Sequence, residues 1–171
     1  MPIERLQSAN GPIADLIREV RTKIGSTEGF EAYLNWGKAK DLKALAEIAY
    51  LITHVKTNKF EPTVQQLETF LDNKPHPLSA AKSHQQFLAI LQPMMPNVMD
   101  TFCCIVKHPE LGKPLRNNVS PLEFVMSAYL VFCYRKKLSN TQLLHAVTQM
   151  RWNAQRSFKD LKFDNTKCKH V

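Results

Sequence analysis

The sequence predicts an all-α protein, a compact single domain over residues 1–171 in which about six to seven helices pack as a bundle. Three observations support this fold class. Apolar residues recur at helical spacing in most segments, helix-start patterns precede several of them, and only 5 glycines interrupt a chain that is 44% hydrophobic. A chain of 171 residues is long enough to fold on an apolar core alone.

The N-terminal part predicts two helices separated by a connector. The first begins at Gly11-Pro12, because proline suits the first helical turn, and ends at Gly25. Its apolar residues follow the helical period: Ile13, Leu16, Ile17, Val20 and Ile24. Residues 25–40 hold three glycines and three aromatic residues, which predicts a connector anchored by its rings. The second helix, over 41–55, has a wide apolar face, and we expect Asp41 to cap it.

The middle of the chain predicts a short helix over 63–71, because Thr63 followed by Gln66 forms a capping-box pattern. Two prolines after this helix indicate an exposed turn.

Ser79 is expected to cap the next helix, and Pro93 and Pro96 are expected to interrupt it. Asn97 would then start a continuation that ends near His108-Pro109, and a basic loop follows over 110–119.

The clearest local pattern is Ser120-Pro121-Leu122-Glu123, in which the serine caps, the proline takes the first helical position and the glutamate completes a capping box. The helix that it opens, over 120–135, is apolar on nearly every side, so we expect it to be the central buried helix; a β-strand fits the cap and the length less well. Ser139 and Gln142 open a last long helix over 139–160 by the same pattern.

Positive charge is concentrated at the C-terminal end. The formal net charge is +8, and residues 101–171 account for all of it. Basic residues of the last two helices, with one aromatic residue among them, are therefore candidates for contacts with phosphates and bases of DNA or RNA. These candidates are Arg135, Lys136, Lys137, Arg151, Trp152, Arg156, Lys159 and Lys162. The alternatives are an ordinary solvated helix face and a module for protein–protein interaction or oligomerisation.

The sequence indicates no catalytic or cofactor chemistry. Phosphate-binding glycine loops, dinucleotide fingerprints and nucleophile elbows are absent from it, and its cysteines and histidines lack the paired spacing of a zinc site. We therefore expect a noncatalytic protein without a metal or cofactor. The four cysteines do not have the spacing of a disulfide framework, and neither a signal peptide nor a membrane-spanning run is evident. An intracellular protein, cytoplasmic or nuclear, with reduced thiols is the simplest interpretation.

The segment from Ser120 to Met126, followed by Arg151, Arg156 and Asp160 and then by Asn165, resembles the C-terminal helical region of ParB-like proteins related to the N-terminal family of GmrSD restriction enzymes. Trp36 ahead of the second helix also fits this resemblance. It implies that nucleotide or nucleic-acid chemistry resides in a ParB-like domain with an Asp-Gly-Gln-Gln-Arg motif, which does not occur here. The chain would then be the helical partner of a catalytic domain and a fragment of a larger protein.

Overall fold

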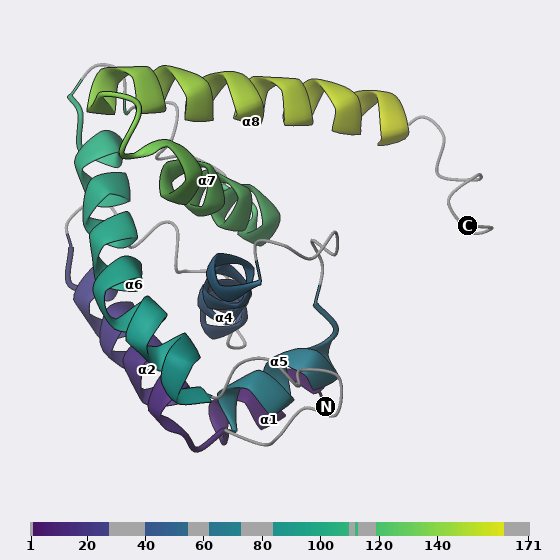
Figure 1. Cartoon of the computed structure of the whole chain (residues 1–171). Helices are drawn as coiled ribbons and strands as arrows, with labels where there is room; N and C mark the ends of the chain where they lie inside the picture. Colours follow the sequence, from purple (N-terminus) through teal and green to yellow (C-terminus); the bar gives the residue numbers. More distant parts are fainter. Residues whose placement is uncertain are drawn as a thin grey trace.

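The computed structural model describes residues 2–27, 40–54, 62–72, 84–109, 112 and 119–162, and beyond residue 154 the only side chain it describes is that of Arg156. Within these ranges it contains helices and no strand, which confirms the all-α prediction (Figure 1). The helices are α1 (Pro2–Gln7), α2 (Pro12–Gly25), α4 (Lys40–Thr53), α5 (Val64–Leu71), α6 (His84–Val106), α7 (Pro121–Tyr134) and α8 (Asn140–Lys162).

Helix α4 is the centre of the bundle. It contacts α1, α2, α5, α6 and α7, and most of its side chains are buried, with Leu45, Ile48 and Ala49 fully so. Figure 1 shows α7 on one side of α4, α1 and α5 on the other, and α2 with α6 along a third side. The wide apolar face of α4 is buried by these neighbours, and Lys43 and Glu47 pair with each other, Nζ to Oε1 at 3.0 Å, on its less buried side.

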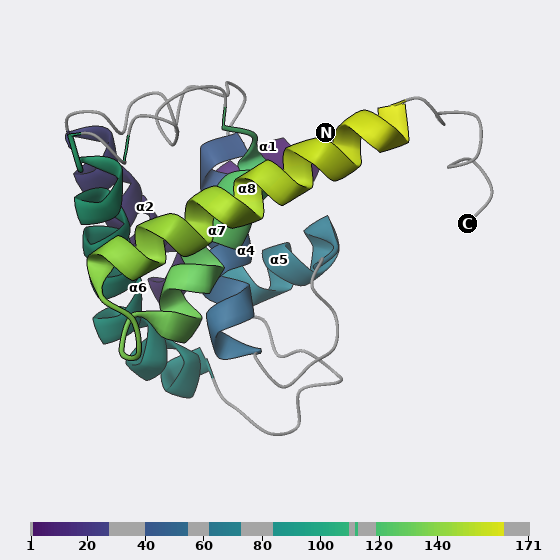
Figure 2. The same ribbon diagram turned by 90° about the horizontal axis from the view of Figure 1, so that it is seen from above.

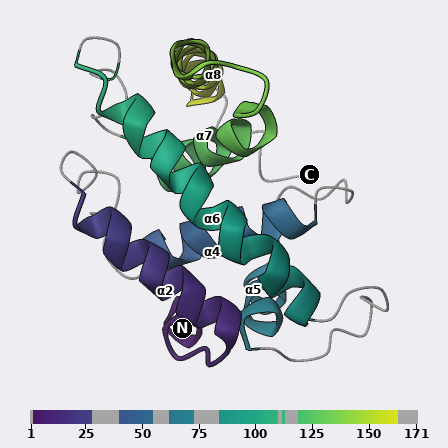
Figure 3. The same cartoon turned by 60° about the vertical axis from the view of Figure 1, so that its left-hand side comes forward.

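Helix α8 forms an outer layer. It contacts α6 and α7, and Figure 3, which looks nearly along its axis, shows it outside both of them. Figures 1 and 2 agree that the C-terminal end of α8 extends past the neighbouring helices. One long side of α8 is consequently exposed to solvent.

The beginning of the chain differs from the prediction in two respects. The six-residue helix α1 was not anticipated, because its buried residue Leu6 has too few apolar neighbours in sequence to show a period. Asp41 was expected to be an N-cap, and this was wrong. Asp41 lies inside the first turn of α4 and is 6% exposed, and its Oδ2 is 2.5 Å from Nε of Arg21 on α2. Its carboxylate therefore joins two helices.

The predicted capping boxes are confirmed. At α5 the Thr63 hydroxyl accepts from the Gln66 amide at 3.2 Å, and the Gln66 side chain accepts from the Thr63 amide at 2.8 Å. Ser139 and Gln142 form the same pair of bonds at α8, at 3.3 and 2.9 Å. Each box satisfies two of the amide donors that a helix start leaves without an intrahelical partner.

Helix α6 corrects the prediction that Pro93 and Pro96 divide it, since both prolines lie inside one continuous helix of 23 residues. Pro93 and Ala89, whose carbonyl would have accepted the bond that proline cannot donate, are both exposed, so water can solvate that carbonyl. Among the described helices, α6 has the length and composition to span a membrane, and 39% of its apolar stretch is buried inside the fold. It packs against α2, α4, α7 and α8, as a core helix does.

Helix α7 is less central than predicted. Phe124, Ala128 and Val131 are fully buried, but Leu122 is 46% exposed and Tyr134 is 47% exposed. The apolar residues of α7 therefore lie both on the side that packs in the bundle and on the side exposed to solvent.

Several predictions fall on residues outside the described ranges. These are the connector over 25–40 beyond Thr27, Val55 at the end of the helix predicted over 41–55, the turn at Pro75 and Pro77, the cap at Ser79 and most of the loop over 110–119; the described α4 ends at Thr53.

Candidate nucleic-acid interface

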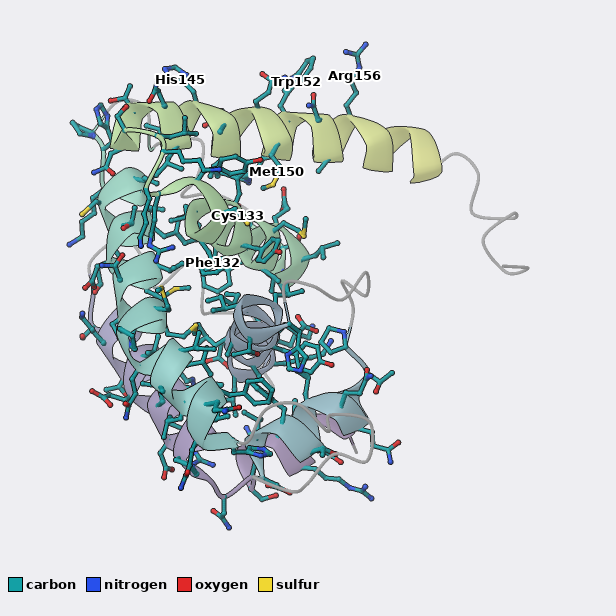
Figure 4. All side chains as sticks on the ribbon, in the orientation of Figure 1. Phe132, Cys133, His145, Met150, Trp152 and Arg156 are labelled. Carbon is teal, nitrogen blue, oxygen red and sulfur yellow. The ribbon has the colours of Figure 1, made fainter. Side chains whose placement is uncertain are left out.

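The two long sides of α8 have opposite character. Leu143, Leu144 and Val147 are buried against α6 and α7. On the opposite side, Figure 4 shows His145, Trp152 and Arg156 pointing away from the bundle, whereas Met150 points toward α7. The exposed side is the part of the predicted interface that a large polyanion can reach.

Arg151 does not belong to that exposed side, and the expectation that it does was wrong. It is 6% exposed, and its Nε lies 3.4 Å from Oε1 of Glu123, which is itself 9% exposed. Arg151 follows Val147 by one helical step of four residues and so continues the buried row. Its positive charge therefore pairs with Glu123 inside the fold.

Glu123 connects this ion pair to the start of α7. Its Oε2 accepts from the Ser120 amide at 2.8 Å, and its own amide donates to the Ser120 hydroxyl at 3.2 Å. One carboxylate thus completes a helix cap and pairs with Arg151 of α8. This arrangement fixes α8 on α7 and so determines which side of α8 faces solvent.

Arg135 lies at the C-cap of α7 and is half-buried. Its guanidinium donates from Nε to Asn97 Oδ1 at 3.0 Å, from Nη1 to the Phe132 carbonyl at 2.7 Å and from Nη2 to Met94 Sδ at 2.8 Å. It also lies 5.4 Å from the Phe132 ring centroid. These contacts attach the end of α7 to α6, so Arg135 contributes mainly to structure and only secondarily to a surface.

Lys136 and Lys137 follow in the turn between α7 and α8, and both side chains are exposed. The turn is ordered by backbone bonds from Lys137 and Leu138 to the Tyr134 carbonyl, at 2.8 and 2.9 Å. The structure therefore places two adjacent exposed lysines in the turn that precedes α8.

Trp152 and Arg156 form the most distinctive feature of the exposed side. Trp152 is 54% exposed, the highest value among the large apolar side chains described, and the guanidinium carbon of Arg156 lies 5.2 Å from its ring centroid. This distance is within the range of a cation–π contact. Beside them, Gln149 donates to Asn153 at 3.2 Å, and both amide side chains are exposed.

Negative charge is missing from this part of the sequence. Between Glu123 and Asp160 the chain contains no aspartate or glutamate, while it contains all the predicted cations except Lys162. Glu123 itself is buried in its pair with Arg151. The stretch from residue 124 to 159 therefore presents cations without a carboxylate of its own, and Asp160 follows it near the end of α8.

The structure thus separates the eight predicted residues into three groups. Lys136, Lys137, Trp152 and Arg156 are exposed, whereas Arg135 is half-buried and Arg151 is buried. The side chains of Lys159 and Lys162 lie outside the described residues, although their backbone belongs to α8. Sequence reasoning missed the role of Glu123 as the partner of Arg151, because the capping-box pattern already accounted for it.

The three thiols that the structure describes show no arrangement typical of a metal site or a nucleophile. Cys103 is half-buried, and Cys104 and Cys133 are exposed. Burial, with a smaller contribution from the Asp100 carboxylate, raises the pKa of the Cys103 thiol to about 11, which disfavours the reactive thiolate. In the part of the chain that the structure describes, no three histidine, cysteine or acidic side chains form a group that could hold a metal ion.

Comparison of this chain with protein-family models, with curated proteins and with solved structures finds no match. The resemblance to the helical region of ParB-like proteins therefore stays a prediction.

Proposed function

We propose that this chain is a noncatalytic helical module that binds nucleic acid through the exposed side of α8 and the turn before it. The observation that carries the proposal is the exposed Trp152–Arg156 pair, which lies within a stretch, residues 124–159, that contains no carboxylate, with Lys136 and Lys137 in the turn before the same helix. Cations that attract phosphates together with an exposed aromatic ring are the usual elements of a nucleic-acid surface.

The proposal uses four residues, which we call the α8 surface: Lys136, Lys137, Trp152 and Arg156. Arg151 and Arg135 stabilise the position of the α8 surface, because their contacts with Glu123 and Asn97 hold α8 and the turn in place. This role also agrees with the resemblance to the helical region of ParB-like proteins, which implies that a separate ParB-like domain performs any chemistry.

A binding titration across a salt series tests the proposal. Removing one contact with a phosphate should reduce the slope of log affinity against log salt by about 0.7 to 0.9. We expect Arg156→Ala and the double change Lys136→Ala with Lys137→Ala to weaken binding and to flatten this slope. Arg5→Ala is a matched control, since Arg5 is an exposed arginine on α1, away from α8 (Figure 1). Affinity that does not depend on salt, or that falls equally with Arg5→Ala, would contradict the proposal.

A second candidate function is protein–protein interaction through α7. Leu122 and Tyr134, at its two ends, are 46% and 47% exposed, and Cys133 beside Tyr134 is also exposed. Exposed apolar side chains on one helix favour docking of a partner or of a second copy. Light scattering of the wild type and of Leu122→Glu would reveal self-association and its loss.

A further inference from the structure

We infer that the nucleic acid bound by the α8 surface is single-stranded, with one unpaired base stacked on Trp152. This inference rests on the proposed function and specifies its ligand. It follows from the chemistry of an exposed indole, from the contact that Arg156 makes with it, and from the position of the two lysines along the helix.

An indole ring offers a nucleic acid mainly its flat face. Tryptophan has one hydrogen-bond donor, the indole N–H, and no acceptor, so it is a poor reader of the base edges that a duplex presents in its grooves. The faces of paired bases are already stacked within a duplex. A base can cover the indole only when the strand is single, and the 54% exposure of Trp152 leaves the ring accessible to one.

Arg156 places a positive charge against the indole ring of Trp152. Its guanidinium lies over the indole, 5.2 Å from the ring centroid, and is exposed, so a base that stacks on the ring does so next to this charge or in its place. A base that stacks on Trp152 would therefore place its phosphate near Arg156. The exposed amides of Gln149 and Asn153 flank the indole on the same helix and can hydrogen-bond to the edges of an unpaired base.

The lysines determine the length of strand required. They lie in the turn before Asn140, and a helix rises about 1.5 Å per residue, so the start of α8 at Asn140 is about 18 Å from Trp152 along the helix. At about 3.4 Å per stacked nucleotide, a strand needs about six nucleotides to reach from the start of α8 to the indole. Affinity should accordingly rise steeply up to about this length and more slowly beyond it.

The alternative ligand is a duplex with α8 in its major groove. The groove is wide enough for a helix, and Gln149, Asn153 and Arg156 are residue types that read base edges. Trp152 lies in the middle of this set, however, and a duplex gives its ring no face to contact. We therefore favour the single strand, and the experiment includes the duplex.

The test measures fluorescence anisotropy of a labelled 12-nucleotide single strand and of the duplex of the same sequence, with wild type and variants. We expect the wild type to prefer the single strand, Trp152→Leu to weaken its binding about tenfold, and Trp152→Phe to retain most of it. Duplex binding should be unchanged by Trp152→Leu. Tyr134→Leu is the control for loss of an exposed aromatic side chain, since Tyr134 is 47% exposed at the end of α7.

Two results would overturn the inference while the proposed function stands. One is salt-dependent binding that Lys136→Ala with Lys137→Ala weakens but Trp152→Leu does not. The other is duplex binding that equals or exceeds binding of the single strand. Absence of binding to both nucleic acids would overturn the inference and the proposed function together. Quenching of a 2-aminopurine base in the strand, abolished by Trp152→Leu, would support stacking directly.

Discussion

Arg151 and Arg156 lie little more than one turn apart on α8, yet the fold surrounds them in opposite ways. Arg151 is 6% exposed and paired with Glu123, whereas Arg156 is exposed and lies over the Trp152 ring. Five residues rotate a helix by about 1.4 turns, which places the two side chains about 140° apart around its axis, so one arginine continues the buried row and the other continues the exposed one. Helical register, rather than charge, therefore decides which cations a partner can reach.

The buried pair gives the largest expected effect. Arg151→Ala leaves the Glu123 carboxylate buried without its charge partner, and loss of one member of a buried pair typically costs about 3 kcal/mol or more. Arg156→Ala removes an exposed contact, so its effect on the free energy of unfolding should stay within about 0.5 kcal/mol. Urea denaturation of the two variants measures both values.

The double variant Glu123→Gln with Arg151→Met sharpens this comparison. Glutamine keeps the capping-box bond to Ser120, and methionine fills the space without a charge, so much of the stability should return. If Arg151→Ala and Arg156→Ala destabilise the protein equally, the distinction between the two sides of α8 is wrong.

The sequence predicted where the helices lie along the chain better than which side of each helix faces solvent. The boxes at Thr63, Ser120 and Ser139 were identifiable because capping depends on residues three positions apart. The burial of Arg151 depends on Glu123, which is 28 residues away in sequence, and on how α7 meets α8. The spacing of Arg151 from Val147 was the one local indication of it.

Trp152 shows the same division between local and tertiary information. Its place among the basic residues was evident from the sequence, but its exposure depends on which side of α8 packs against α6 and α7. The continuity of α6 through Pro93 and Pro96 also required the fold, because packing against four other helices holds the segment helical where proline removes hydrogen bonds.

The two capping boxes of α7 and α8 extend the comparison to a smaller effect. Ser120→Ala removes a cap whose glutamate is buried and paired with Arg151, whereas Ser139→Ala removes a cap whose glutamine is exposed. We expect Ser120→Ala to lower the free energy of unfolding by about 1 to 2 kcal/mol and Ser139→Ala by about 0.5 to 1 kcal/mol. Denaturant titrations of the single variants give the difference, and a larger loss for Ser139→Ala would show that the Glu123 network does not strengthen its cap.

Two adjacent cysteines of α6 provide the smallest and most local test of the rule that register decides exposure. Cys103 is half-buried and Cys104 is exposed. Because burial raises the pKa of Cys103 to about 11, only about one molecule in a thousand carries its thiolate at pH 8. Iodoacetamide should therefore modify Cys104 at least about tenfold faster than Cys103 at this pH, as measured by mass spectrometry of the native protein. Raising the pH from 8 to 10 increases the Cys103 thiolate, so its rate should rise throughout that interval without reaching a plateau. A plateau near pH 9 would mean that Cys103 has the pKa of an exposed thiol and that α6 does not shield it.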